Sequence, residues 1–197
     1  MLVKANAYAY NTSSVEEVVL LLDPGAQNSF ITTSTTHRLR LPIYDRKERT
    51  FLTFGGHETT EVTGVVDVDL LDFSDRILKV HLTSKDIITS TQVPPRLSDA
   101  DFKFLRDNRL PIPSCTSSRP VMPDILIGID NYWDVLLQEP PVCLPSGMVL
   151  TYTRFGTVVS GNSVFLSGYR RAQIPMKCIH HSRQTMKSQG DSGHLTL

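Results

Sequence analysis

Two short apolar runs, each followed by an aspartate and a glycine, constrain the fold of this 197-residue chain more than any other feature. Residues 18–22 (VVLLL) are apolar throughout, and Asp23-Pro24-Gly25 follows directly. An apolar run this short, closed by turn residues, is typical of a buried β-strand. Much later, Ile125-Leu126-Ile127 is followed by Gly128 and then by Asp130. The chain is therefore expected to bury two apolar strands that end close to carboxylates.

The rest of the sequence has the pattern of short strands with few helices. Alternating or continuous apolar residues predict strands at residues 3–10, 29–31, 50–54, 66–70, 78–82, 149–153, 157–159 and 164–166. Helical structure is expected only at residues 33–39, at 98–107, where Ser98 can cap the first turn, and at 131–137. This order favours an all-β fold with a closed or nearly closed sheet and one or two short helices.

Composition and charge exclude several classes of protein. Hydrophobic residues make up 40% of the chain, enough to bury a core, and 20 basic residues balance 20 acidic ones. No net charge attracts nucleic acid or an anionic membrane, and no apolar run reaches the roughly 18 residues of a membrane-spanning helix. Three widely spaced cysteines form neither a disulfide scaffold nor a CxxC-type zinc site. These features predict an intracellular, cytoplasmic protein without a signal peptide.

We expect one domain over residues 1–169 and a basic, flexible tail over residues 170–197. The tail contains five basic residues and one acidic residue but few large apolar ones, so it is interpreted as a solvated extension that could touch RNA weakly. Its Asp191-Ser192-Gly193 lacks a preceding apolar strand, and its Cys178-Ile179-His180-His181 lacks a fourth metal ligand. Neither motif is expected to form a site, and no metal or organic cofactor is expected.

The segment Asp23-Pro24-Gly25 has two interpretations. All three are common turn residues, so they could do no more than end a strand. Alternatively, a carboxylate at the edge of the core is suited to acid–base chemistry, because Gly25 can turn sharply and donate its N–H to that carboxylate. The tripeptide alone does not decide between the two.

Three segments, taken in order, resemble the retropepsin-type aspartic proteases of retroviruses and retrotransposons. They are residues 22–31 (LDPGAQNSFI), 126–133 (LIGIDNYW) and 154–161 (RFGTVVSG), with a glycine-tipped hairpin between the first two. More narrowly, they are similar to the protease segment of Bel/Pao-type retrotransposon polyproteins, over about residues 3–168. The resemblance implies a barrel-like acid protease that acts on polypeptide, including its own polyprotein, and uses no cofactor.

The resemblance also implies that each chain supplies half of the active site. Asp23 would be the catalytic residue, on an active-site loop formed with Pro24, Gly25 and Ala26. Two chains would pair their aspartates across a twofold axis, so a homodimer is expected. Two carboxylates about 3 Å apart cannot both ionise, so they share one proton. The charged one then activates a water molecule, and the protonated one polarises the scissile carbonyl.

Two further segments receive roles from the same resemblance. The flap that closes over a bound peptide would be formed by Phe54, Gly55 and Gly56, although Gly-Gly is also an ordinary hairpin turn. A structural motif behind the active-site loop would comprise Ile127, Gly128 and Asp130. Tyr132 and Trp133 are expected to pack behind the Gly128 turn and to serve structure alone.

Pro24 departs from the pattern of the family. Ser or Thr normally stands between the aspartate and the glycine, and its hydroxyl takes part in hydrogen bonds between the two active-site loops. Proline has neither a hydroxyl nor an N–H, so those bonds are lost. The alternative function is therefore a catalytically degenerate, protease-derived module that is retained for binding or dimerisation.

Overall fold

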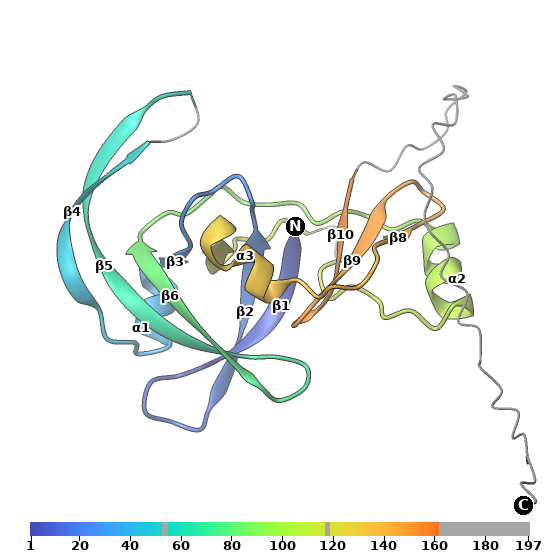
Figure 1. The fold of residues 1–197 in the computed structure, drawn as a ribbon, viewed down its shortest axis with the longest axis horizontal. Coiled ribbons are helices and arrows are strands. Elements are labelled where there is room, and N and C mark those ends of the chain that lie inside the picture. Colours follow the sequence, from blue (N-terminus) through green and yellow to red (C-terminus); the bar gives the residue numbers. More distant parts are fainter. Residues whose placement is uncertain (53–54, 117–118, 162–197) are drawn as a thin grey trace, which may run out of the picture.

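The computed structural model describes residues 1–52, 55–116 and 119–161 of the chain (Figure 1). The strands are β1 (Leu2–Tyr8), β2 (Val15–Leu22), β3 (Phe30–Thr32), β4 (Tyr44–Leu52), β5 (Glu58–Leu71), β6 (Ile77–Lys85), β7 (Ile125–Ile127), β8 (Val142–Cys143), β9 (Val149–Thr153) and β10 (Gly156–Ser160). The helices are α1 (Thr33–Arg38), α2 (Asp99–Asp107) and α3 (Ile129–Val135). The predicted strand at 164–166 and the predicted tail, with its two motifs, lie outside the described residues, so the boundary at residue 169 stays a prediction.

Most of the strands form one sheet that closes into a barrel. Its order is β1-β2-β7-β3-β6-β5-β4, and β5 pairs with β1 as well, through Asn6–Leu71 and Ala7–Leu70. The closure is possible because β5 is long, with 14 residues. Its first half pairs with β4, and its last residues reach β1 (Figure 1). The predicted all-β fold with a closed sheet is confirmed.

The apolar run of β2 lies at the centre of this barrel. Val18, Leu20 and Leu22 point inward and are at most 2% exposed, whereas Val19 and Leu21 are half-buried on the other face. β2 pairs with β1 on one side and runs parallel to β7 on the other, with Leu22 opposite Ile127. Both of the apolar strands that the sequence predicts are therefore neighbours in the sheet, and they end at the same edge.

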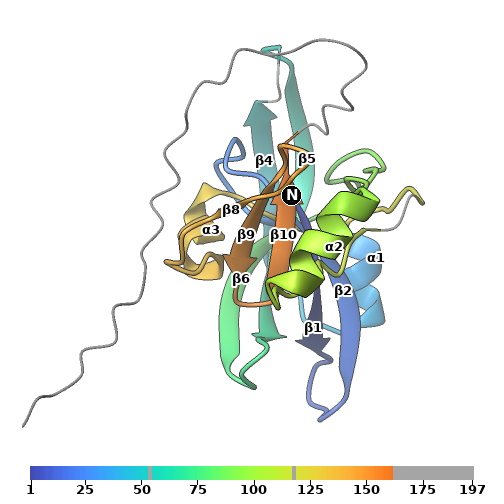
Figure 2. The same ribbon diagram turned by 90° about the vertical axis from the view of Figure 1, so that its right-hand side faces the viewer.

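A second, smaller sheet packs against the barrel and is covered by α2. Its order is β10-β9-β8. Val158 of β10 belongs to the barrel core, while the next residue, Val159, belongs to a separate apolar cluster with Leu105 of α2. Ser98 caps α2, as predicted, in a capping box with Asp101. Figure 2 shows α2 in front of β10. None of the helices in the three described ranges is long and apolar enough to cross a membrane.

A buried ion pair connects this small sheet to the barrel. The side chain of Asp72, in the turn after β5, is 0% exposed and accepts bonds from Arg154 Nε at 3.2 Å and Nη2 at 3.0 Å. Backbone N–H groups of Ser74 and Arg76 donate to its other oxygen. Burial alone would raise the pKa of Asp72, but the two N–H bonds and the Arg154 guanidinium outweigh it, and the pKa is lowered.

This ion pair makes the folded state sensitive to acid. The folded chain binds a proton at Asp72 less readily than the unfolded chain does, so the stabilisation is present above the unfolded pKa of about 3.9 and is lost as pH falls through the lower, folded pKa. We expect Asp72→Asn to be less stable than wild type at neutral pH and to lose less stability below about pH 4. Thermal unfolding followed by circular dichroism across this range tests both. Parallel pH profiles for the two proteins would contradict the assignment.

Candidate active site

Asp23 lies at the carboxyl end of β2, where the strand leaves the barrel core. Its backbone N–H donates to Ile127 O at 2.9 Å, so pairing with the β7 strand continues up to this residue. The side chain is half-buried. Gly25 N donates to Asp23 Oδ1 at 3.0 Å, and Ala26 N donates to Asp23 O at 3.1 Å. The tripeptide is therefore both a tight turn and a holder of the carboxylate, and the two interpretations of the sequence are compatible.

The chain engages the carboxylate of Asp23 only in part, through one hydrogen bond and an electrostatic interaction with the Met1 ammonium. Among the described residues, Gly25 N is its one hydrogen-bond donor. Pro24 and Gly25 are exposed, so the loop faces outward beside the carboxylate. A Cβ atom at Gly25 would lie 3.2 Å from Asp23 Oδ1, which is tighter than ordinary contact. The short approach of the Gly25 backbone thus positions the carboxylate without covering it.

Gly128 packs against the predicted active-site loop. An added Cβ atom at Gly128 would lie 2.5 Å from Asn28 O and 2.8 Å from Ala26 O, and backbone atoms cannot yield as the end of a side chain can. The next residue, Ile129, donates its N–H to Ala26 O at 2.8 Å. The predicted structural motif and the predicted active-site loop are therefore in direct contact, and only glycine fits at their junction.

Asp130 acts through Ser29, which is 1% exposed. Asp130 Oδ2 accepts the backbone N–H of Ser29 at 3.0 Å, and Oδ1 accepts its hydroxyl at 2.6 Å. The Ser29 hydroxyl in turn accepts the N–H of Gly128 at 2.9 Å and the side-chain amide of Asn131 at 3.1 Å. Sequence reasoning predicts Ser29 only as the start of a strand. A serine directly after the loop, with a carboxylate near the second apolar strand, is the signal that could have revealed this bond network.

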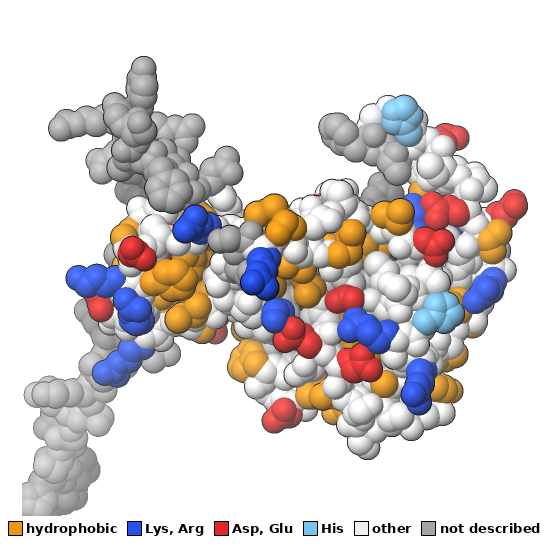
Figure 3. Space-filling model, turned by 180° about the vertical axis from the view of Figure 1, so that it is seen from behind, with side chains coloured by type: hydrophobic (Ala, Val, Ile, Leu, Met, Phe, Trp, Pro, Cys, Tyr) orange, Lys and Arg blue, Asp and Glu red, His pale blue; other side chains and the backbone are white. Residues whose placement is uncertain are grey.

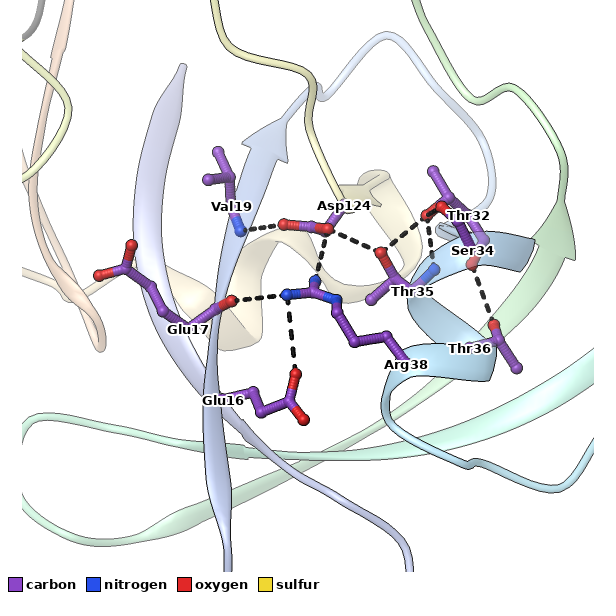
Figure 4. A network of polar contacts seen from close by, with 9 residues as sticks. All are labelled: Glu16, Glu17, Val19, Thr32, Ser34, Thr35, Thr36, Arg38 and Asp124. Carbon is purple, nitrogen blue, oxygen red and sulfur yellow. Dashed lines mark hydrogen bonds and ion pairs between the residues drawn. The ribbon is translucent and has the colours of Figure 1, made fainter.

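A second carboxylate network lies at the opposite end of β7 (Figure 4). Asp124 Oδ2 accepts Val19 N at 2.8 Å, while Oδ1 accepts the Thr35 hydroxyl at 2.6 Å and Arg38 Nη2 at 2.7 Å. These bonds connect β2, α1 and the residue that begins the β7 segment. The network has the form of a structural anchor, because Asp124 accepts three bonds from two other elements of the fold.

The β4–β5 hairpin has the shape expected for a flap. Leu52 is paired with Glu58, and the tip residues Gly55 and Gly56 have φ values of +89° and +80°, which favour glycine. Phe54, the third predicted flap residue, lies outside the described residues. Figure 3 shows the hairpin rising from the body of the protein with a hollow beside it.

Aromatic and charged side chains pack on the outer half of this hairpin, where Phe51 pairs with Thr59 directly before the last pair, Leu52–Glu58. The Phe51 ring meets Phe30 of β3 edge-on at 5.6 Å, and the Lys85 ammonium lies 4.5 Å from the centre of the Phe51 ring. Lys85 also pairs with Glu61 at 2.9 Å. These contacts connect the outer half of the hairpin to β3 and β6, so β4 is attached to the barrel as far as Phe51.

Of the two aromatic residues expected behind the Gly128 turn, one is buried and the other is not. Tyr132 is 7% exposed and belongs to the barrel core, as predicted. Trp133 is 70% exposed, so the prediction that it packs behind the turn is wrong. The reason is the helical period: Tyr132 and Val135 of α3 face the core, which turns Trp133 toward solvent.

The match to known proteins agrees with this geometry. A family model described as aspartyl protease matches residues 11–130. This chain belongs to the aspartyl protease family. The match includes the Asp23 loop and extends to Asp130, so it covers both the loop and the Gly128–Asp130 segment that packs against it. No curated protein matches the chain, and neither does any solved structure.

Membership of the aspartyl protease family confirms the broader part of the resemblance. The fold is that of an all-β, retropepsin-like aspartic protease, and the family supports a protease-type function. The retrotransposon subtype and the catalytic role of Asp23 stay predictions. Within the described ranges, no group of three or more His, Cys, Asp or Glu side chains could hold a metal ion.

The contacts of Asp130 predict a structural role that is separate from catalysis. Asp130→Asn replaces one acceptor oxygen by an amide that cannot accept, so a buried Ser29 donor loses its partner. We expect a loss of about 1–2 kcal/mol of unfolding free energy. Asp134→Asn, on the exposed side of the same helix, is the matched control and should change stability little. Urea unfolding measures both. Equal stability of the two variants would show that the Ser29 bonds do not support the loop.

Proposed function

We propose that this protein is an aspartic endopeptidase of the retrotransposon type, and more narrowly of the Bel/Pao type. Its substrates are polypeptides, including the polyprotein of which it forms part. The observation that carries the proposal is Asp23, a carboxylate held by Gly25 N at 3.0 Å on a loop that packs against Gly128, yet open on its outer side. A fixed and accessible carboxylate is what a general base requires.

The proposed reaction needs two chains. Asp23-Pro24-Gly25 supplies one carboxylate, and a homodimer brings the second one to the same water molecule. The two carboxylates share one proton because both cannot ionise at close range. The ionised one takes a proton from water, whose oxygen attacks the peptide carbonyl carbon, while the protonated one donates to the carbonyl oxygen. The protonated carboxylate then gives its proton to the leaving nitrogen while the other takes a proton from a hydroxyl of the tetrahedral gem-diol. The C–N bond breaks, a carboxylic acid and an amine are released, and the pair again holds one proton.

Other segments have supporting roles in this proposal. The hairpin with Gly55 and Gly56 at its tip closes over the bound peptide, with Phe54 completing the flap. Gly128 and Asp130 fix the loop that carries Asp23. We further propose that residues 1–169 form the protease domain, that residues 170–197 are a solvated basic tail, and that the protein acts in the cytoplasm.

A second candidate function is a catalytically silent binding or dimerisation module. Pro24 favours it, because this exposed residue brings neither a hydroxyl nor an N–H to the place where two loops would meet. The intact carboxylate of Asp23 favours the enzyme, since a half-buried charge is costly to keep without use.

Substitution of Asp23 tests the proposed chemistry. We expect Asp23→Asn to abolish peptide cleavage without lowering the unfolding temperature, because the asparagine oxygen can still accept the bond from Gly25 N. Cleavage by wild type should follow a bell-shaped pH profile with its maximum on the acid side. Mass spectrometry of a peptide library at several pH values measures cleavage and its pH profile, and thermal unfolding measures the stability of the variant. The exposed Asp134→Asn is the control that should remain active. Cleavage that survives in Asp23→Asn would refute the assignment.

Substitution of Pro24 separates the enzyme from the silent module. Pro24→Ser restores a hydroxyl and an N–H at the dimer centre, and each new buried bond contributes roughly 0.5–1.5 kcal/mol. Twofold symmetry doubles each bond, so dimer dissociation should tighten about ten- to hundredfold. Sedimentation and peptide turnover on one substrate measure the effect. If wild type is silent and Pro24→Ser is active, the silent module is supported. If wild type is active and Pro24→Ser changes neither dimer dissociation nor peptide turnover, Pro24 does not weaken the dimer or the reaction.

A further inference from the structure

An exposed apolar face on α3 lies next to the active-site loop. Trp133 is 70% exposed and Ile129 is 41% exposed, and residues four apart on a helix share one face. Trp133 is the one tryptophan of the chain. Adjacent large apolar side chains in water are unfavourable, and covering them with another protein removes that cost. We call Ile129 and Trp133 the α3 face.

The α3 face is positioned rigidly against the half-site. Ile129 N donates to Ala26 O at 2.8 Å, and Gly128 packs on the backbone of Asn28, so the helix begins on the loop that carries Asp23. The Trp133 ring meets the buried Tyr132 ring edge-on, with centroids 5.4 Å apart. A side chain held in this way loses little conformational freedom when a partner covers it.

The requirements of the dyad identify the partner as a second copy of the chain. This step rests on the proposed function. Two carboxylates that share a proton are about 3 Å apart, so the loops that carry them touch. A stable interface buries about 800 Å² on each partner, which the few exposed residues of the active-site loop cannot supply. The contact must therefore continue onto neighbouring surface, and Ile129 is bonded directly to the loop.

We propose that the α3 face is the apolar anchor of the homodimer and aligns the two Asp23 carboxylates. The contact is isologous, so each tryptophan occurs twice in the interface. Large aromatic residues near the centre of an interface contribute much of its binding energy. Trp133 is a positioning residue in this scheme, since it acts on the reaction only through assembly.

The single tryptophan permits a direct test on the full chain. As the protein is diluted through the range in which sedimentation shows dissociation, Trp133 should pass from a buried to a solvated site. Its emission maximum should move to longer wavelength, and quenching by acrylamide should increase. Emission that stays constant while the dimer dissociates would overturn the inference and leave the dimer itself intact. A tryptophan protected even in the monomer would also overturn it, because another part of the chain then covers the α3 face.

Substitution of the tryptophan supplies the second test. We expect Trp133→Ala to raise the dissociation constant of the dimer about a hundredfold or more. Activity should be lost at low protein concentration and recovered at high concentration. Phe73→Ala is the matched control, because Phe73 is an aromatic residue of 66% exposure in the β5–β6 turn, and it should leave dissociation unchanged. An unchanged dimer in Trp133→Ala would overturn the inference.

Joining two copies into one chain distinguishes this inference from the proposed function. A tandem fusion of two Trp133→Ala copies should cleave peptide at all concentrations, because the linker replaces the lost contact. If the fusion is active but separate copies dimerise as wild type does, the α3 face is not the anchor, and the protease assignment stands. If neither wild type nor the fusion cleaves any peptide, the proposed enzyme itself is wrong. A strictly monomeric wild type with Asp23-dependent cleavage would refute the dimer and the anchor together.

Discussion

The site depends on the packing of the backbone at residues 26–28 against Gly128. A Cβ atom there would lie 2.5 Å from Asn28 O, so no other amino acid fits without moving the loop. The contact lets two strand ends that are remote in sequence lie side by side, with Leu22 opposite Ile127. The Ser29 hydroxyl completes the junction by bonding Gly128 N and Asp130. This junction fixes the backbone of the loop that carries Asp23.

The fold and the proposed chemistry set opposite demands on pH. A dyad that shares a proton works best under mildly acidic conditions. Asp72, by contrast, is buried and charged, and it connects the small sheet to the barrel through Arg154 only while it stays ionised. Because its pKa is lowered, this connection persists to more acidic conditions than an ordinary aspartate would allow. The ion pair therefore stabilises the fold until pH falls to the lowered pKa of Asp72, and this stabilisation is lost below it.

Features encoded in local sequence were predictable, and those that depend on distant contacts were not. The apolar run of β2 and the Ser98 cap of α2 carry their own signals, and both elements form where expected. The Asp72–Arg154 pair joins residues far apart in the chain, so no local pattern reveals it. The prediction for Trp133 is wrong for another reason. It is based on residue type, since tryptophan is usually buried. In a short helix, however, the side chains that enter the core are chosen by the helical period, and in α3 these are Tyr132 and Val135.

The described carboxylates near the strand ends divide into two kinds. Asp124 and Asp130 each accept several hydrogen bonds from buried or partly buried donors, so both carboxylates stabilise the fold. Asp23 accepts one bond, from the exposed Gly25, and keeps its outer side open. That difference, rather than the tripeptide alone, distinguishes Asp23 from the two structural carboxylates and supports its proposed catalytic role.

Pro24 then gives the proposed dimer a specific physical requirement. In the family pattern, the hydroxyl at this position contributes polar bonds between the two loops, and proline removes them. An interface that has lost polar bonds at its centre can be stabilised by apolar burial at its flank, where geometry is less demanding. The α3 face begins at the residue bonded to the loop and presents the one tryptophan of the chain. In the proposed dimer, the exposed tryptophan and the unusual proline thus have one explanation: apolar contact replaces the hydrogen bonds that proline cannot make between the two loops.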